Sequence, residues 1–151
     1  MGATYALTGS DTITINAIPL NDFADGDIGN LEIPNNLVEM VTGKNNNTIF
    51  SYNPAGNNAT LTLRVLMSSA DDKRLNGLIP KESDFERTSL CTGSVIKRVG
   101  DGNGKVSVNM YSLAGGIVQK KPTIKANVSG DVQQAVVEYV IIFANATRSI
   151  T

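Results

Sequence analysis

Strict alternation of apolar and polar residues is the feature that most restricts how this chain can fold. The clearest case is the segment Ala59–Met67, where five apolar side chains share one face while Thr60, Thr62 and Arg64 share the other. Successive side chains of a β-strand point to opposite faces of its sheet. The segment therefore predicts a strand with one face on a core and the other in water. Thr12–Asn16 alternates in the same way.

Further strands are predicted along the rest of the chain. Lys105–Met110 alternates, and Ala135–Phe143 is apolar on both faces, so we expect this last strand in the middle of a sheet, covered on both sides. Weaker strand patterns occupy Tyr5–Thr8, Leu31–Val41, Thr48–Tyr52, Leu90–Val99 and Thr123–Val128. The Gly-rich segment Gly100–Gly104 lies between two strand patterns and predicts a hairpin turn.

One helix is expected over Ser68–Ile79. It begins with serines that suit an N-cap and continues with two acids, Asp71 and Asp72, that suit the first turn. Leu75, Leu78 and Ile79 follow at helical spacing and form a narrow apolar stripe, and Pro80 ends the segment. We expect this stripe to cover an open side of the β-structure, with residues 71–74 facing solvent or a neighbouring subunit.

These elements predict a mainly β fold, a β-sandwich or partial barrel with one flanking α-helix. The 151 residues suit a single domain that spans residues 1–151.

The segment Thr42–Asn58 is predicted to be a long polar loop. It is rich in Asn and Gly and holds one short apolar island, Ile49–Phe50. Long loops in compact domains are commonly functional, so we expect the island to dock onto another subunit. The alternative is that it continues a strand and is buried in its own core. The candidate contact residues are Lys44, Asn45, Asn46, Asn47, Ile49, Phe50 and Tyr52.

The residue types exclude most catalytic chemistry. The chain has no His and one cysteine, Cys91, so Ser–His and Cys–His pairs and zinc sites of His and Cys are not possible within it. Cys91 lies in an alternating pattern and is interpreted as a buried thiol. Asp25–Asp27 and Asp101–Gly104 resemble fragments of calcium loops but lack the distal Glu, so both are interpreted as turns. We therefore expect no enzyme activity, no cofactor and no metal site.

Charge and segment patterns restrict the partners. With 13 basic and 14 acidic residues the formal net charge is −1, and no basic stripe suits DNA phosphates. The first ten residues do not have the basic and apolar regions of a signal peptide, and no apolar run is long enough to span a membrane. We therefore expect neither secretion nor a membrane anchor.

A set of short motifs resembles one protein family. Phe23–Asp27 follows an opening β segment, and an Asn-rich loop at Asn45–Asn47 then leads into the alternating strand from Ala59 and the helix from Ser68. In this order the chain resembles the tail tube proteins of contractile-tailed bacteriophages over its first half. Its second half is similar in strand pattern alone.

The resemblance implies a virion structural protein. Subunits of that family form stacked hexameric rings, in which strands from six copies close one β-barrel around a channel and a long loop reaches a neighbour. DNA passes through the channel without specific binding. The implied partners are further copies of the chain, a tail sheath protein on the outside, and terminator and baseplate proteins at the ends. The implied place is the phage tail, assembled in the host cytoplasm.

The polar face of the 59–67 strand is the expected channel lining. Thr60, Thr62 and Arg64 would line it, and the adjacent segment Leu31–Val41 would add Glu32 and Glu39. Because Arg64 would attract DNA, a carboxylate is expected near it.

Three alternatives remain open from the sequence. They are another phage or tail-like assembly protein, a secreted or pilus-type β-sandwich binding module, and an enzyme that uses carboxylates alone, drawn from Asp22, Asp25, Asp27, Glu32 and Glu39. The missing signal peptide disfavours a secreted module, and the absence of Trp disfavours a sugar-binding or sugar-cleaving site.

Overall fold

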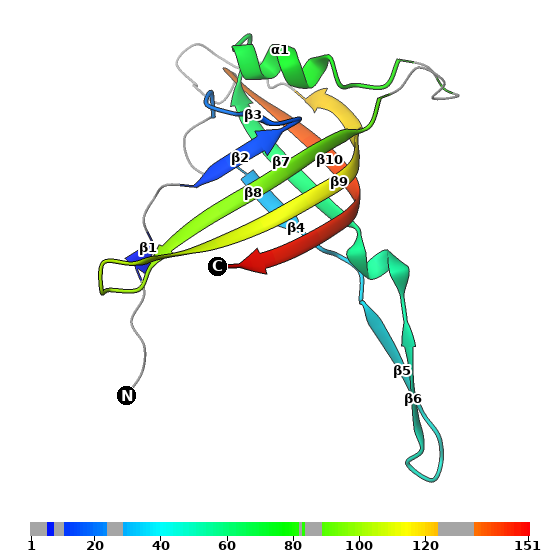
Figure 1. Cartoon of the computed structure of the whole chain (residues 1–151). Helices are drawn as coiled ribbons and strands as arrows, with labels where there is room; N and C mark the ends of the chain where they lie inside the picture. The colour runs from blue at the N-terminus through cyan, green and yellow to red at the C-terminus, as the bar shows by residue number, and fades with distance from the viewer. Residues whose placement is uncertain (1–5, 8–10, 24–28, 82, 84–88, 124–134) are drawn as a thin grey trace.

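The structure is a computed structural model that describes residues 6–7, 11–23, 29–81, 83, 89–123 and 135–151 (Figure 1). Over these residues the chain is mostly β, with antiparallel strands and one α-helix. The predicted fold class is therefore confirmed. The predicted strand at Thr123–Val128, apart from Thr123, and the Phe23–Asp27 motif, apart from Phe23, lie outside the described residues.

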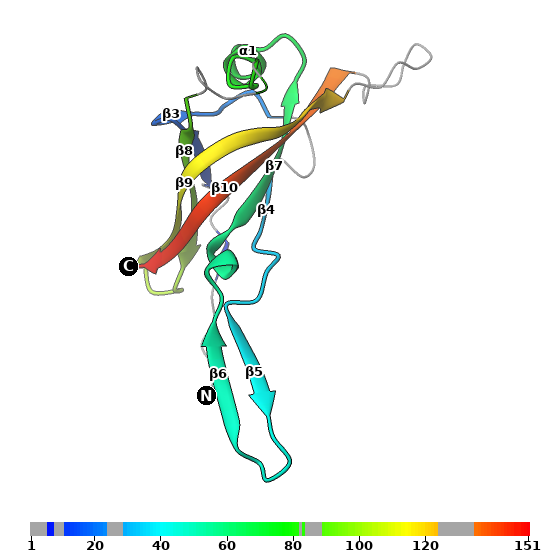
Figure 2. The ribbon, with the colours of Figure 1, turned by 90° about the vertical axis from the view of Figure 1, so that its right-hand side faces the viewer.

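Eight strands form one large sheet that does not close into a barrel. Its spatial order is β3-β2-β8-β9-β10-β7-β4, with β1 paired to β8. The strands of this sheet are β1 (Ala6–Leu7), β2 (Thr12–Ile15), β3 (Ile18–Pro19), β4 (Gly29–Glu32), β7 (Ala59–Leu66), β8 (Cys91–Gly100), β9 (Val106–Thr123) and β10 (Val136–Ile150). A separate hairpin, the arm, consists of β5 (Val38–Thr42) and β6 (Thr48–Tyr52) and projects from the sheet (Figures 1 and 2).

The long strands β9 and β10 run through both halves of the sheet. β10 pairs with β7 over residues 136–143, whereas over residues 145–150 its described partner is β9. β9 pairs with β8 over residues 106–116. Near this crossing Gly115 has a φ of +68°, and the interval between buried positions changes from two residues to three, at 113 and 116 and again at 143 and 146. Both strands bend there, and the sheet curves around its core (Figure 2).

The core lies on the concave side of this curved sheet. In β7, Ala59, Leu61, Leu63 and Val65 are each at most 2% exposed, as their alternation predicts. Other buried apolar residues come from β2, β9 and β10, the largest being Tyr139 and Phe143. The described buried apolar residues form one cluster, which consists of Ile13, Ile15, Leu20, Ala59, Leu61, Leu63, Val65, Leu75, Cys91, Leu113, Val118, Val137, Tyr139, Ile141, Phe143 and Ala146.

The two ends of the sheet approach each other across the core. A Cβ atom on Gly29 of β4 would lie 2.7 Å from Cδ1 of Ile13 on β2. That distance is below van der Waals contact, so a side chain on Gly29 would displace the end of the Ile13 side chain. The curved sheet is thereby nearly closed, which agrees with the predicted sandwich or partial barrel.

The helix α1 (Ala70–Asn76) is shorter than the predicted Ser68–Ile79. Ser68 has a φ of +64° and Ser69 is the N-cap, whose side chain accepts a hydrogen bond from the Asp72 N–H. Gly77 is the C-cap, and Leu78 and Ile79 continue as a turn. Leu75 is fully buried, whereas Leu78 and Ile79 are partly buried against the core. The predicted stripe therefore packs as expected, although only Leu75 lies inside the helix.

Two predicted boundaries were wrong. The segment Leu31–Val41 contains parts of two strands, β4 and β5, separated by residues 33–37. Thr42–Asn58 is not a structureless loop, since it holds the turn of the arm, the whole of β6, and the 3-10 helix η1 (Pro54–Asn57). The predicted turn at Gly100–Gly104 is confirmed between β8 and β9, where Asp101 Oδ1 accepts from the Asn103 and Lys105 N–H groups.

Candidate assembly surfaces

The arm has two faces of different composition. Cross-strand partners in an antiparallel pair share a face, and Val38 pairs with Tyr52 and Met40 with Phe50. These four residues form the Phe50 face. On the other side Glu39 pairs with Ser51 and Val41 with Ile49, and these four form the Ile49 face. The four residues of the Phe50 face are apolar or aromatic, whereas the Ile49 face combines two apolar residues with one acid and one serine.

Nothing in the described chain covers the arm. Its six large apolar side chains, Val38, Met40, Val41, Ile49, Phe50 and Tyr52, are between 50% and 72% exposed. The alternative that Ile49 and Phe50 are buried in their own core is therefore wrong, although they do lie in a strand. The charged residues of the arm are Glu39 in β5 and Lys44 at the tip, where Asn45, Asn46 and Asn47 also lie.

The arm is held firmly at its base and at its tip. At the base, the Asn53 N–H donates to the Leu37 carbonyl at 2.7 Å, and the Asn53 side chain donates to the Asn36 carbonyl at 3.0 Å. A Cβ atom on the buried Gly56 would lie 2.8 Å from the Leu37 nitrogen, so glycine is required where η1 crosses the base. At the tip, Gly43 and Asn47 form a backbone hydrogen bond of 2.8 Å. These contacts fix the base and the tip of the arm internally, and η1 at the base contacts β10 of the sheet.

The expected channel-lining residues on β4 and β7 lie on the convex, outer face of the sheet. Thr60, Thr62 and Arg64 alternate with the buried residues of β7, and Glu32 is the cross-strand partner of Thr60. Glu39, by contrast, lies on the arm and is not part of this face. The structure therefore brings together four of the five residues and separates the fifth.

A carboxylate does lie beside Arg64, as the sequence predicted. Glu138 of β10 is the cross-strand partner of Arg64, so the two side chains share the outer face. Opposite charges at such positions interact favourably, which reduces the local positive charge.

The outer face changes from polar to apolar across the sheet. β4 and β7 present Glu32, Thr60 and Thr62, whereas β10 presents Val140 and Ile142. These two residues are half-buried. β10 is therefore central in the sheet, as predicted, but its second face is not fully covered within the described chain.

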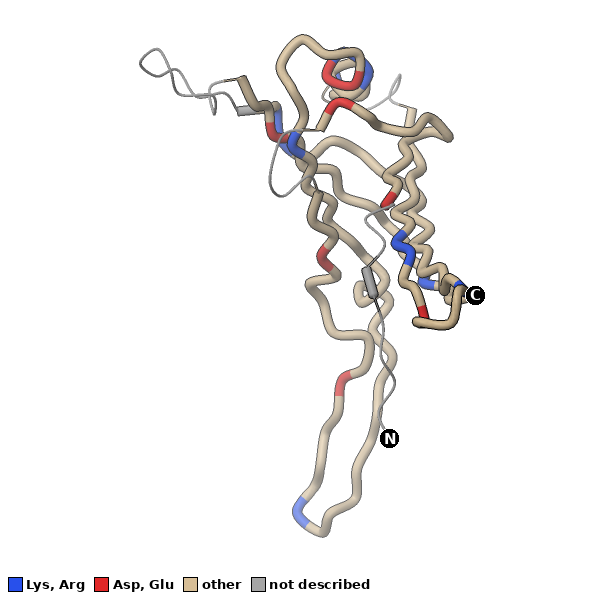
Figure 3. Tube along the Cα trace, turned by 90° about the vertical axis from the view of Figure 1, so that its left-hand side faces the viewer, with Lys and Arg blue, Asp and Glu red and all other residues tan. Residues whose placement is uncertain are grey.

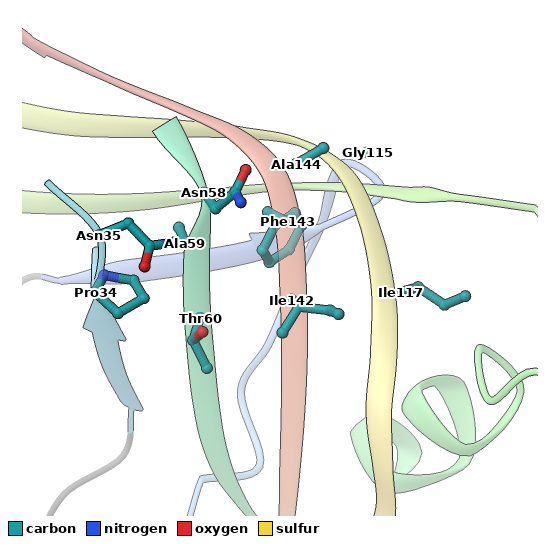
Figure 4. Close-up of a pocket in the computed structure, with 10 residues that line it drawn as sticks. All are labelled: Pro34, Asn35, Asn58, Ala59, Thr60, Gly115, Ile117, Ile142, Phe143 and Ala144. Carbon is teal, nitrogen blue, oxygen red and sulfur yellow. The ribbon is translucent and has the colours of Figure 1, made fainter. Parts of the chain in front are cut away.

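An open groove of about 400 Å³ lies on this outer face near the base of the arm. Figure 4 shows Thr60 from β7, Ile142 from β10 and Ile117 from β9 along it, with Pro34 and Asn35 at one side. Its lining is mostly apolar and includes no charged side chain. The groove therefore suits an apolar side chain of another polypeptide better than a charged ligand.

Asp71 was expected to face solvent or a neighbour, and this was wrong. Its side chain is 1% exposed. Oδ2 accepts hydrogen bonds from the backbone N–H groups of Asn21 and Asp22 at 2.6 and 2.7 Å, and Oδ1 accepts from Arg74 Nη1 at 3.0 Å. Asp71 therefore fastens the segment after β3 to the helix. Two first-turn acids look alike in sequence, and no pattern separates the buried one.

Asp72 also has a structural role. It accepts hydrogen bonds from the Tyr139 hydroxyl and from the Ser68 N–H at 2.8 Å. Burial raises the pKa of the Tyr139 hydroxyl, and the hydrogen bond to the Asp72 carboxylate raises it further. Tyr139 therefore stays protonated and links α1 to β10.

Two candidate reactive features, the single thiol and clustered acids, can be checked among the described residues. Cys91 is buried, and burial raises the pKa of its thiol, which disfavours the reactive thiolate. Among the described residues no three His, Cys, Asp or Glu side chains gather as a metal site. Glu32 and Glu39 lie on separate sheets, while Asp25 and Asp27 are outside the described residues. No described helix is long and apolar enough to cross a membrane.

Comparisons with known proteins add one structural likeness. No protein-family model matches the chain, and no curated protein matches it. Among solved structures, a chain of the anti-feeding prophage baseplate, determined by cryo-EM and 6-fold symmetrised, is similar. It has a TM-score of 0.43 and 10% identity, over 100% of this chain and 94% of that one. A likeness at this level establishes neither a family nor a function.

Proposed function

We propose that this protein is a structural subunit of a phage tail, and specifically a tail tube subunit that assembles with copies of itself into stacked six-membered rings. The observation that carries the proposal is the arm. A rigidly based hairpin with six exposed apolar side chains has a use when another subunit covers it.

The energetics of the arm favour such a contact. A two-stranded hairpin without a packed face is marginally stable in water. Burial of apolar surface contributes roughly 25 cal/mol per Å², and a buried aromatic side chain covers about 150–250 Å². Docking Phe50 and Tyr52 alone would therefore contribute several kcal/mol. Burial against another subunit would therefore stabilise the arm, and the same contact would hold the two subunits together.

Strand edges that have no partner among the described residues support assembly as well. Over residues 145–150 the described partner of β10 is β9 on one side, and β4 pairs with β7 on one side. Open edges of this kind invite pairing with another chain. In the proposed ring, neighbouring copies close these edges, and the sheets join into one barrel around the channel.

In this proposal the polar half of the outer face lines the channel. Glu32, Thr60, Thr62 and Arg64 lie together there, and Glu138 offsets Arg64. Hydroxyl groups and balanced charge give DNA phosphates little to bind, so the DNA can pass. A sheath outside the tube, and terminator and baseplate proteins at its ends, are the further partners that we propose.

Electron microscopy of purified protein tests the proposal. Concentrated wild type should form rings or tubes under negative stain. Ile49→Asn, which replaces an exposed apolar side chain, should stay monomeric with an unchanged melting temperature, and Asn45→Ala at the arm tip is the matched control that should assemble. Wild type that sediments as a monomer at every concentration refutes the proposal.

A further inference from the structure

A second groove shares Ile117 and Ile142 with the first and extends from there to Ile79, which follows α1. It has a volume of about 480 Å³, and its apolar lining includes Ile79, Ile117 and Ile142, while Lys81 and Lys121 bring positive charge to it. We propose that this groove receives the Ile49 face of the arm from a second copy of the chain. This inference rests on the proposed self-assembly and assigns the surface that accepts the arm.

Beside the groove, part of β9 has a strand partner on one side only among the described residues. The pairing of β9 with β8 ends at Gly116, so the described part of β9 from Ile117 onward is paired with β10 alone. An incoming strand can add to such an edge through backbone hydrogen bonds, while its side chains enter the adjacent pocket. The arm is made of two strands, and each has one outer edge available for this pairing.

Charge selects the Ile49 face over the Phe50 face. Glu39 is the one acid between residues 33 and 63, and it lies on the same face as Val41 and Ile49. The groove offers the matching arrangement, with apolar side chains for Val41 and Ile49 and lysines for Glu39. Glu39 is two residues from Val41, about 7 Å along the strand, so an apolar contact and an ion pair both fit within one docked strand. The Phe50 face offers no charge to the lysines.

The arm and the groove are two different surfaces of the chain. Figures 1 and 2 show α1 and the arm at opposite ends of the molecule, and Figure 3 shows that charged residues are sparse along the arm and more frequent at the α1 end. A contact between two different surfaces of the chain can repeat from copy to copy. Depending on the rotation between successive copies it closes a ring or continues as an open stack, and a tube of stacked rings uses both kinds of contact.

Charge reversal tests the docking. Glu39→Lys should raise the concentration needed for half-maximal assembly roughly tenfold, or about 1.4 kcal/mol, and Lys121→Glu should do the same. The double variant Glu39→Lys/Lys121→Glu restores the pair with its signs exchanged and should assemble near the wild-type concentration. Lys105→Glu, in the exposed β8–β9 turn, is the control that should neither impair assembly nor rescue Glu39→Lys.

The outcomes separate this inference from the proposed function. If wild type assembles and Glu39→Lys assembles equally well, or if the double variant is no better than Glu39→Lys, the arm docks elsewhere and the groove assignment is wrong while self-assembly stands. If wild type never assembles, both fail. Rescue by Lys121→Glu and not by Lys105→Glu supports the groove.

Discussion

Replacing Asp71 with Asn tests the hydrogen bonds of the buried Asp71 carboxylate, which the sequence did not predict. The carboxylate accepts two backbone N–H groups through one oxygen and the Arg74 guanidinium through the other. A carboxamide has one acceptor oxygen and one NH2 group. Whichever way it turns, the NH2 group meets donors on one side, so at least one of the two contacts is lost.

The size of the effect follows from these contacts. Hydrogen bonds to charged groups contribute about 1.5–3 kcal/mol each, and Asp71 is 1% exposed, so water does not replace the lost partner easily. We expect Asp71→Asn to reduce the free energy of unfolding by about 2–3 kcal/mol. For a chain of this length that lowers the melting temperature by roughly 5–10 °C.

Thermal and urea melts of matched variants measure this effect. Arg74→Ala is the control, since it removes the ion pair and leaves the two backbone contacts. The Arg74 side chain is 48% exposed, so this change should cost less than about 1 kcal/mol. Asp71→Asn that melts within about 1 °C of wild type, or Arg74→Ala that costs as much as Asp71→Asn, would refute the reasoning.

Three further predictions concern packing, the arm and pH. Leu75→Ala should cost about 2–5 kcal/mol, since Leu75 is fully buried, and the partly buried Leu78 should cost less when changed to Ala, as thermal melts will show. Gly56→Ala places a Cβ atom against the backbone of Leu37, so it should cost about 1–3 kcal/mol and weaken assembly measured by sedimentation. Burial raises the pKa of Tyr139 above that of an unfolded tyrosine, about 10. The contribution of the Tyr139 hydroxyl to the free energy of unfolding is therefore complete below about pH 10 and is lost as the pH rises above that value. The Tyr139→Phe variant should not show this loss of stability in thermal melts from about pH 8 to about pH 11.

Elements with an uninterrupted local pattern were predicted well. β7, β6 and the turn after Gly100 are each found within a residue or two of the predicted segment. Their signals are alternation and turn-forming glycines, which act between near neighbours in the chain. The N-terminal boundary of α1 likewise follows from Ser69 as a cap.

Elements that depend on distant partners were predicted poorly. β9 and β10 extend well past the predicted Met110 and Phe143, because the bend at Gly115 interrupts the alternation that would have revealed the longer strands. The pattern of Leu31–Val41 did not show that its start belongs to β4 in the large sheet and its end to β5 in the arm. Which strand β5 pairs with depends on the whole arm, and this separated Glu39 from the other expected channel residues.

The sequence by itself determined that this chain is a β protein with one helix, and its residue types excluded His-dependent chemistry and left a weakly charged surface suited to contacts with other chains. Alternation, helix caps and turn residues act between residues close in sequence, so they can be recognised from the sequence alone. Tertiary structure decided that residues 38–52 leave the body as an exposed arm, that Asp71 is buried while Asp72 supports Tyr139, and that the outer face divides into a polar and an apolar half. Each of these depends on which strands become neighbours, and that choice is made by contacts between residues far apart in the chain.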